Sequence, residues 1–204
     1  MEEVKDFKRK ELFDMYNARS NPFAFVTTKI DITNIYNLCK VKKHHYATIA
    51  YFLTKAMNNV DEFKYRFIDG KIYKCDVIRP SFTDILDDNT IGFYTCEMLD
   101  DYEEFLVHYD ELKTKFLKRE YKGEEVQDVV WLSCQPWFNF TGVVPPFDKS
   151  ITIPQLNWDR FTFEGDRCYI NLMIMVHHGF ADGYHIGKLI ENIETIIANL
   201  KDSE

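Results

Sequence analysis

The amino-acid sequence predicts an α/β (α+β) two-layer sandwich, in which one mixed β-sheet carries helices mainly on one face. Three long segments place apolar residues at the spacing of an amphipathic helix, and shorter segments rich in β-branched and aromatic residues predict strands between them. Strands and helices follow one another without strict alternation, which favours a mixed sheet. No repeat or Pro-, Gly- or Ser-rich linker divides the chain, so we expect residues 1–204 to form a single domain.

The first part of the chain predicts two helices, a strand and a hairpin. Residues 6–18 predict a short charged helix, and residues 22–32 predict a strand. Residues 65–75 predict a hairpin that turns at Gly70. Residues 46–60 predict the first long helix, whose apolar stripe consists of Tyr46, Ile49, Ala50, Leu53, Ala56, Met57 and Val60.

The middle of the chain predicts two strands followed by the second long helix. Residues 79–86 and 91–98 have strand composition. Residues 100–120 begin with acidic and end with basic side chains, an arrangement that the helix dipole favours. The apolar stripe of this helix consists of Tyr102, Phe105, Leu106, Tyr109, Leu112 and Phe116.

The last part of the chain completes the sheet and ends in a helix. Residues 129–142 predict an extended segment that Pro136 interrupts, and residues 151–178 predict two strands joined by a Gly-Asp turn. The third long helix is expected over residues 186–200, where the apolar residues are Ile186, Leu189, Ile190, Ile193, Ile196, Ile197 and Leu200.

Composition and charge narrow the class of protein. An apolar fraction of 46% and an aromatic fraction of 16% supply a sizeable core, and a net charge of −8 argues against nucleic acid, because phosphate binding needs a basic face. The N-terminal segment has no apolar signal region, and the longest nearly apolar run, residues 168–176, is too short to span a bilayer. Five cysteines without a C-x-x-C pair indicate reduced, mostly buried thiols. We therefore expect a cytoplasmic protein that does not bind membranes.

The segment MVHHGFADGYHIG, residues 175–187, gathers three histidines and an aspartate. His177 and His178 are neighbours at the end of a predicted strand, where successive side chains point to opposite faces. They cannot both bind one ion unless the strand breaks, and no Glu or Cys stands at a zinc spacing. This disfavours a metal site and leaves a metal-dependent hydrolase as the weakest of the alternatives.

Two other interpretations of this segment remain. The histidines can be packed residues with satisfied hydrogen bonds, but this does not account for Asp182 and Gly183 at their fixed offsets. Alternatively, a strand opens into a turn in which Gly179 and Gly183 permit tight geometry, and one histidine projects into a cleft. A neutral imidazole there can take a proton from an alcohol or thiol near pH 7.

The sequence HHGFADG resembles the H-H-x-x-x-D-G signature of the CoA-dependent acyltransferase superfamily. The chain lacks a lipoyl domain and is about half the length of a condensation domain, so it most resembles the free-standing chloramphenicol acetyltransferase family. Four further segments resemble that family in order along the chain: FKRKELFDMYN (7–17), TTKIDIT (27–33), LSCQPWFNF (132–140) and FEGDR (163–167).

The resemblance implies unequal roles for these residues. It assigns His178 as the general base that deprotonates an acceptor hydroxyl for attack on acetyl-CoA, without a covalent acyl-enzyme. Ser133 matches a serine that stabilises the oxyanion, although a serine that merely ends a strand is the alternative. Asp182 matches a structural aspartate whose partner is placed at Arg9, for which the alternative is a solvated residue within the run Lys-Arg-Lys. His177 is expected to point away from the base, and His185 to be part of the helix start.

The resemblance also implies positions that bind the acceptor and the cofactor, and some of these depart from the family pattern. Tyr16 falls where the family lines its acceptor pocket, and Arg160 where a basic residue lies near the cofactor phosphates. Ile91 and Phe93 stand where family members carry a Phe and a small residue, and Asn157 stands where a Thr helps to hold a water. These three departures concern the acceptor rather than the transfer chemistry.

The sequence therefore predicts an acetyl-CoA-dependent O-acetyltransferase that needs no metal, with chloramphenicol as the first acceptor to test. The resemblance also implies a homotrimer whose active sites lie between subunits, and antibiotic resistance as the associated role. The alternatives are an acyltransferase of the same fold that acts on a different small alcohol or amine, and a catalytically silent protein that binds a hydrophobic ligand.

Overall fold

The computed structural model describes residues 1–123 and 125–200. The helices are α1 (Lys10–Asn17), α2 (Thr33–Lys42), α3 (His45–Asn58), the short 3-10 helix η1 (Asp61–Lys64), α4 (Tyr102–Leu117) and α5 (Gly183–Asn199). The strands are β1 (Glu2–Glu3), β2 (Phe23–Asp31), β3 (Tyr65–Ile68), β4 (Lys71–Lys74), β5 (Arg79–Ile85), β6 (Ile91–Thr95), β7 (Val129–Gln135), β8 (Gln155–Asp159), β9 (Thr162–Glu164) and β10 (Arg167–His177).

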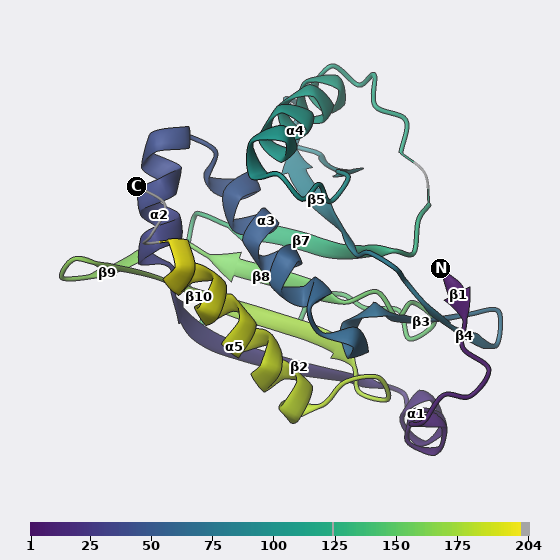
Figure 1. Cartoon of the computed structure of the whole chain (residues 1–204). Coiled ribbons are helices and arrows are strands. Elements are labelled where there is room, and N and C mark those ends of the chain that lie inside the picture. The colour runs from purple at the N-terminus through teal and green to yellow at the C-terminus, as the bar shows by residue number, and fades with distance from the viewer. Residues whose placement is uncertain (124, 201–204) are drawn as a thin grey trace.

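One large mixed sheet organises the molecule (Figure 1). Its strands follow the order β2-β10-β8-β7-β5-β6, and β9 adds to β10 as a short extra pairing. The pairs β8–β7 and β7–β5 are parallel, whereas β2–β10, β10–β8 and β5–β6 are antiparallel. Because β8 and β10 run in opposite directions, their carboxyl ends lie at opposite edges of the sheet.

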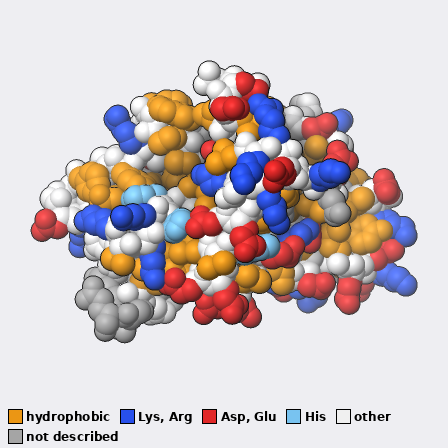
Figure 2. All heavy atoms as spheres, turned by 90° about the horizontal axis from the view of Figure 1, so that it is seen from above, with side chains coloured by type: hydrophobic (Ala, Val, Ile, Leu, Met, Phe, Trp, Pro, Cys, Tyr) orange, Lys and Arg blue, Asp and Glu red, His pale blue; other side chains and the backbone are white. Residues whose placement is uncertain are grey.

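The helices α2 to α5 cover one face of this sheet, and α1 lies beyond its edge (Figure 1). The covered face presents buried side chains at alternate strand positions, among them Ile30, Leu132, Leu156, Trp158, Leu172 and Ile174. The opposite face carries the residues between them and is partly covered by the segment 136–150, which contributes Phe140, Val143 and Phe147. Figure 2 shows side chains of both charges interspersed among hydrophobic areas on the face seen from above.

The predicted mixed sheet with helices on one face is confirmed, as are the three long helices and the hairpin of β3 and β4. The hairpin turns at Gly70 with φ +79°, a conformation that glycine adopts without strain. The first helix is shorter than the predicted 6–18, because the chain before Lys10 bends to bury Phe7 against Tyr65 and Phe180.

One other prediction about the elements needs correction, and one helix was missed. Residues 151–178 form three strands rather than two, since β9 pairs separately with the start of β10. The helix α2 was not expected from the sequence. It begins where the carboxylate of Asp31 accepts hydrogen bonds from the Thr33 amide and hydroxyl, and it buries Ile35 and Cys39 against the core.

Candidate active site

The turn after β10 holds His178 beside the first helix. The last residue of the strand, His177, still pairs with Phe23 of β2, and the amide of His178 donates to the carbonyl of Pro22 at 2.8 Å. The imidazole of His178 stacks on the ring of Tyr16, with centroids 4.1 Å apart and planes 11° apart. Its Nδ1 is buried and has no hydrogen-bond partner among the described residues. Backbone pairing and stacking therefore fix the position of this ring.

His177 is fully buried, whereas the ring of His178 lies against Tyr16. The ring of His177 packs between Phe13, Phe23 and Phe180, and its Nδ1 accepts a hydrogen bond from the amide of Gly179 at 3.2 Å. Burial lowers the pKa of His177 to about 4, from an ordinary value near 6.5, because the charged form loses its hydration. This histidine is a neutral core residue near pH 7.

Gly179 lets the first helix approach the turn. A Cβ at this position would lie 2.7 Å from the Cα of Phe13 and 3.0 Å from the ring of His177. A side chain here would push α1, and Tyr16 with it, away from His178. Gly183 differs, since a Cβ there would meet open space within the described structure, so the expectation that Gly183 relieves tight geometry is not met.

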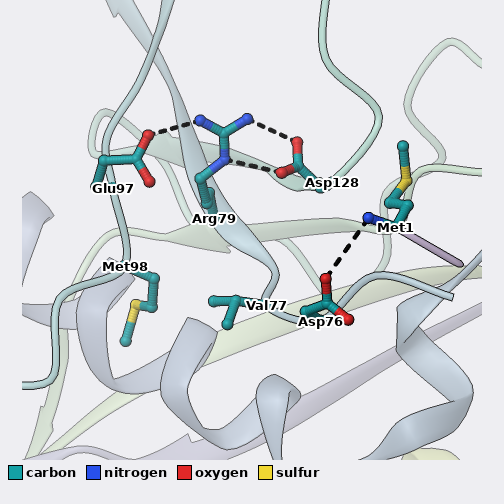
Figure 3. Close-up of a pocket in the computed structure, with 7 residues that line it drawn as sticks. All are labelled: Met1, Asp76, Val77, Arg79, Glu97, Met98 and Asp128. Atoms are coloured by element: carbon teal, nitrogen blue, oxygen red, sulfur yellow. Dashed lines mark hydrogen bonds and ion pairs between the residues drawn. The ribbon is translucent and has the colours of Figure 1, made fainter.

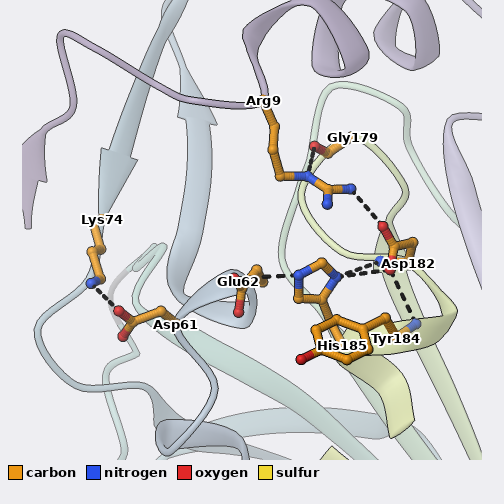
Figure 4. Close-up of polar contacts among 8 residues, drawn as sticks. All are labelled: Arg9, Asp61, Glu62, Lys74, Gly179, Asp182, Tyr184 and His185. Atoms are coloured by element: carbon orange, nitrogen blue, oxygen red, sulfur yellow. Dashed lines mark hydrogen bonds and ion pairs between the residues drawn. The ribbon is translucent and has the colours of Figure 1, made fainter. Parts of the chain in front are cut away.

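The predicted contact between Arg9 and Asp182 is present (Figure 4). Arg9 donates from Nη2 to Asp182 Oδ2 at 3.0 Å and from Nε to the carbonyl of Gly179 at 3.4 Å. Asp182 is also the N-cap of α5, because its Oδ1 accepts from the amide of Tyr184. Burial alone would raise the pKa of Asp182, but the hydrogen bond from Arg9 and the nearby positive charge hold it below its ordinary value.

His185 does more than begin the last helix. Its Nδ1 lies 2.9 Å from Asp182 Oδ1, and its Nε2 lies 3.3 Å from Oε1 of Glu62 in η1 (Figure 4). Sequence reasoning did not find Glu62, because no local pattern connects η1 with the turn after β10.

Ser133 lies on the open face of the sheet near the end of β7. It stands opposite Asn157 of β8, and its Oγ accepts a hydrogen bond from Gln135 Nε2 at 3.0 Å. Both Ser133 and Gln135 line a cavity of about 680 Å³, together with His45, Ile91, Trp137 and Phe161. A serine hydroxyl that already accepts one hydrogen bond can still donate its proton to a bound ligand.

The cavity opens where β5 and β7 part. The two strands pair as far as Phe82 and Leu132, and beyond that point the side chain of Tyr46 from α3 enters between them. Its hydroxyl accepts from the amide of Thr83 and lies within hydrogen-bond distance of the carbonyls of Thr83 and Leu132. Burial raises the pKa of Tyr46, so the hydroxyl stays protonated. Tyr46 thus satisfies backbone groups that the sheet leaves unpaired beside Ser133.

Of the remaining predicted site residues, Asn157, Ile91 and Arg160 lie near Ser133 or its cavity, and Phe93 does not line the cavity. Asn157 is buried next to Ser133 and accepts from Gln155 at 3.1 Å. Ile91 and Arg160 line the cavity, and the guanidinium of Arg160 is exposed at its rim, where it donates to Asn139. Phe93 lies on the edge strand β6 and is 61% exposed, but it is not among the cavity-lining residues.

The site residues form two clusters that lie far apart. Ser133 pairs through Asn157 with Met173 of β10, a distance of two strand spacings, or about 10 Å. His178 follows five residues beyond Met173, about 16 Å further along the strand direction. One chain therefore does not bring Ser133 and His178 around a single small molecule.

Among the described residues, the cysteines and the possible metal ligands give no competing site. Within the described ranges, the five cysteines form no disulfide, and burial raises the pKa of Cys39, Cys96 and Cys134 to about 12, which keeps these thiols protonated. The same part of the chain contains no cluster of three or more His, Cys, Asp or Glu that could hold a metal ion. None of its helices is long and apolar enough to cross a membrane.

A second cavity, of about 450 Å³, lies beside Arg79, the first residue of β5 (Figure 3). Arg79 reaches from its wall to Glu97 and Asp128, and the amino group of Met1 faces Asp76. The charged side chains drawn there pair with one another, so this cavity resembles a set of surface ion pairs rather than a reaction site.

Comparison with solved structures defines the class of fold. A structure named chloramphenicol acetyltransferase matches with a TM-score of 0.80 at 19% identity and covers 95% of this chain and 96% of its own. A probable dihydrolipoamide acetyltransferase from Listeria monocytogenes matches with a TM-score of 0.68 at 13% identity and covers 100% of this chain and 97% of its own. The chain thus has a fold that acetyltransferases of two kinds share.

Comparison of sequences identifies the family, which the shared fold alone does not. Residues 2–194 match the family model described as Chloramphenicol acetyltransferase. Chloramphenicol acetyltransferase 3 of Escherichia coli is 26% identical over 95% of this chain and 94% of its own, and the enzyme of Campylobacter coli is 26% identical over 96% of both. The chain belongs to the chloramphenicol acetyltransferase family.

Proposed function

We propose that this protein is an acyltransferase that moves the acetyl group of acetyl-CoA to a hydroxyl of chloramphenicol. The observation that carries the proposal is the family match over residues 2–194. The relatives at 24–26% identity are named chloramphenicol acetyltransferases, and each is covered over nine-tenths or more of its length. We further propose that residues 1–204 act as a single domain around the one large sheet.

His178 is the general base in this proposal. Its imidazole takes the proton of the acceptor hydroxyl while the oxygen attacks the thioester carbonyl carbon. The tetrahedral intermediate then collapses, the carbon–sulfur bond breaks, and the CoA thiolate receives the proton. The stacking on Tyr16 and the support from Arg9 and Asp182 hold the ring for this step. His177 does not compete for the proton, since its ring is buried among Phe13, Phe23 and Phe180.

Ser133 stabilises the negative charge on the intermediate. Its oxygen accepts a hydrogen bond from the side-chain Nε2 of Gln135, which leaves the hydroxyl proton free to point at the oxyanion. A single donor of this kind can be worth about 3 kcal/mol of barrier, because it acts on charge that develops only in the transition state.

The distance between the two clusters supports an active site formed by two copies of the chain. A base and an oxyanion donor that act on one tetrahedral centre must both lie within a few Å of it, which one chain does not allow. A contact that brings the His178 end of one copy to the Ser133 cavity of the next is head-to-tail, the kind of contact from which closed rings such as trimers are built. We propose a homotrimer with its active sites between subunits, as the family resemblance implies.

The cavity beside Ser133 is the proposed entry for acetyl-CoA, with Arg160 at its rim for the phosphates. The acceptor would lie between this cavity and the neighbouring copy, against Tyr16, Asn157, Ile91 and Phe93. The reaction consumes acetyl-CoA, so the proposed compartment is the cytoplasm. Acetylation of the antibiotic would make resistance the expected role of the protein in the cell.

The test is release of free CoA thiol from acetyl-CoA in the presence of chloramphenicol. Release that depends on the drug and disappears in His178→Ala supports the proposal. Release only with other small alcohols or amines would instead identify a different acceptor. Saturable binding without any release would point to a catalytically silent protein.

A complementation experiment tests the shared site. His178→Ala and Ser133→Ala chains are each expected to be nearly inactive. Co-expressed in equal amounts, they should recover activity in about a quarter of the sites, because random assembly pairs an intact His178 with an intact Ser133 from different copies at that frequency. No recovery in a mixed oligomer would place both residues in the same chain's site and contradict the proposal.

A further inference from the structure

Besides Arg9, a second charged side chain belongs to the polar contacts beside the turn at His178. Glu62, in the short helix η1, places Oε1 3.3 Å from Nε2 of His185 (Figure 4). His185 in turn places Nδ1 2.9 Å from Oδ1 of Asp182 and 3.3 Å from the Asp182 amide. The imidazole thus connects η1 to the N-cap of α5.

Asp182 is consequently held at both oxygens. Arg9 occupies Oδ2, whereas His185 and the amide of Tyr184 occupy Oδ1. The His185 side chain is only 9% exposed, and those of Arg9, Glu62 and Asp182 are between 24% and 31% exposed. Water competes least for the central imidazole, so the contact that connects Glu62 to Asp182 is the best protected of the network.

The two supports approach the turn from different parts of the chain. Arg9 precedes α1 and also binds the carbonyl of Gly179, the residue after the base. Glu62 follows α3, the helix at the centre of the covered face. Without Glu62, the carboxylate of Asp182 would be held by Arg9 and by the first turn of α5, with no contact to η1.

We propose that Glu62 is a positioning residue for His178: through His185 and Asp182 it fixes residues 178–182 so that the imidazole of His178 keeps its place against Tyr16. The kinetic part of this inference rests on the proposed function, whereas the structural part does not. Neither Glu62 nor His185 is required to touch a substrate.

The neighbouring residue Asp61 provides a matched control. It lies in the same turn of η1 and carries the same charge, but it pairs with Lys74 at 2.7 Å, away from His185 (Figure 4). It also lies 3.8 Å from the ammonium of Lys64. Glu62→Ala and Asp61→Ala therefore remove one carboxylate each from one short helix, and only the first breaks the connection to the turn.

Kinetics form the first arm of the test. In Glu62→Ala, kcat should fall about ten-fold while KM for both substrates stays within about two-fold, because a displaced base weakens the transition state and not substrate binding. Glu62→Gln, which keeps a side-chain oxygen at the same reach from His185 Nε2, should restore most of the rate. Asp61→Ala should match the wild-type kcat, and all three should melt within a few degrees of one another.

The second arm needs no turnover. The imidazole resonances of His178, assigned by their loss in His178→Ala, should shift in the nitrogen–proton spectrum of Glu62→Ala and stay in place in Asp61→Ala. Should Glu62→Ala fail to fold, His185→Asn replaces it, since the shorter amide can remain beside Asp182 but cannot reach Glu62.

Unchanged His178 resonances and unchanged kcat in Glu62→Ala would overturn the inference. So would an equal loss in Asp61→Ala, or a loss confined to KM. If the wild-type protein releases no CoA with any acceptor, the proposed function fails, and the spectra alone decide whether Glu62 positions His178.

Discussion

The two clusters of candidate site residues are built in opposite ways. At the end of β10, the imidazole of His178 is fixed by its own backbone, by stacking on Tyr16 and by the ion pair of Arg9 and Asp182. At the end of β7, Ser133 borders an open cavity where two strands part. In the first cluster the groups that place the candidate base also hold segments of the fold together. In the second, the candidate oxyanion donor can be removed without disturbing a fold contact of comparable strength. Activity and stability should therefore be linked in one cluster and separable in the other.

The largest expected effect is a loss of activity without a loss of stability when Ser133 is replaced. In Ser133→Ala, kcat should fall about 100-fold, which corresponds to loss of about 3 kcal/mol of transition-state stabilisation. The thermal midpoint should stay within a few degrees of wild type, because Ser133 is half-buried and its described hydrogen bond joins it to Gln135 of the same strand. Steady-state kinetics and a melting curve check both halves. A matching fall in stability would remove the contrast between the clusters.

Arg9→Ala should lower both activity and stability. The carboxylate of Asp182 would lose its charged partner while half-buried, at a cost of about 2 kcal/mol, less than for a fully buried pair. The turn at His178 would loosen, and kcat should fall about ten-fold. Urea unfolding and kinetics on one preparation measure the two effects. Lys10→Ala, which removes only the exposed pair with Asp14, is the control and should leave both unchanged.

Low pH should lower the free energy of unfolding, because the buried imidazole of His177 resists protonation in the folded chain. Its pKa is lowered to about 4 in the folded chain, so between that value and the ordinary pKa near 6.5 the unfolded chain binds the extra proton. Stability is therefore present above pH 6.5 and lost as the pH falls through this window, by roughly 1 kcal/mol between pH 7 and pH 5.5. Urea midpoints across this range measure the slope. His177→Phe, which suits the aromatic surroundings, should flatten it, and an unchanged slope would show that other groups are responsible.

The smallest expected effect lies at the rim of the cavity. Arg160 is exposed and its described partners belong to the neighbouring residues Phe138 and Asn139. Arg160→Ala should raise KM for acetyl-CoA about threefold at low salt and leave kcat and the melting temperature unchanged, as an exposed charge on a phosphate would. The difference should shrink in high salt. An effect on kcat instead would mean that Arg160 lies nearer the reacting atoms than its position suggests.

Patterns within a segment predicted the fold well, and contacts between segments explain what was missed. The long helices each carry an apolar stripe, so α3, α4 and α5 follow from spacing alone. The helix α2 follows from the hydrogen bonds that Asp31 accepts from Thr33 and from the buried pair Ile35 and Cys39, a signal too short to stand out beside the strand before it. The three-residue strand β9 exists only because β10 is there to pair with it.

The same difference holds for the site. Alternation along β10 predicted that His177 and His178 face opposite ways, and the family resemblance supplied Arg9 and Ser133. Glu62 and Tyr46 could not be found in this way, since their importance comes from segments that the fold brings to them. The parting of β5 and β7 likewise has no sequence signature, because it results from a side chain that enters from α3.

The pairing of β10 has a consequence for the order in which the molecule can be made. This strand inserts between β2, near one end of the chain, and β8, and it is synthesised after both of them. Until residue 177 has left the ribosome, β2 has no strand to pair with and the sheet stays in two pieces. Such long-range pairing forms late in folding. The strand that closes the sheet is also the one that leads into His178, so the turn that carries this histidine forms only when the sheet is complete.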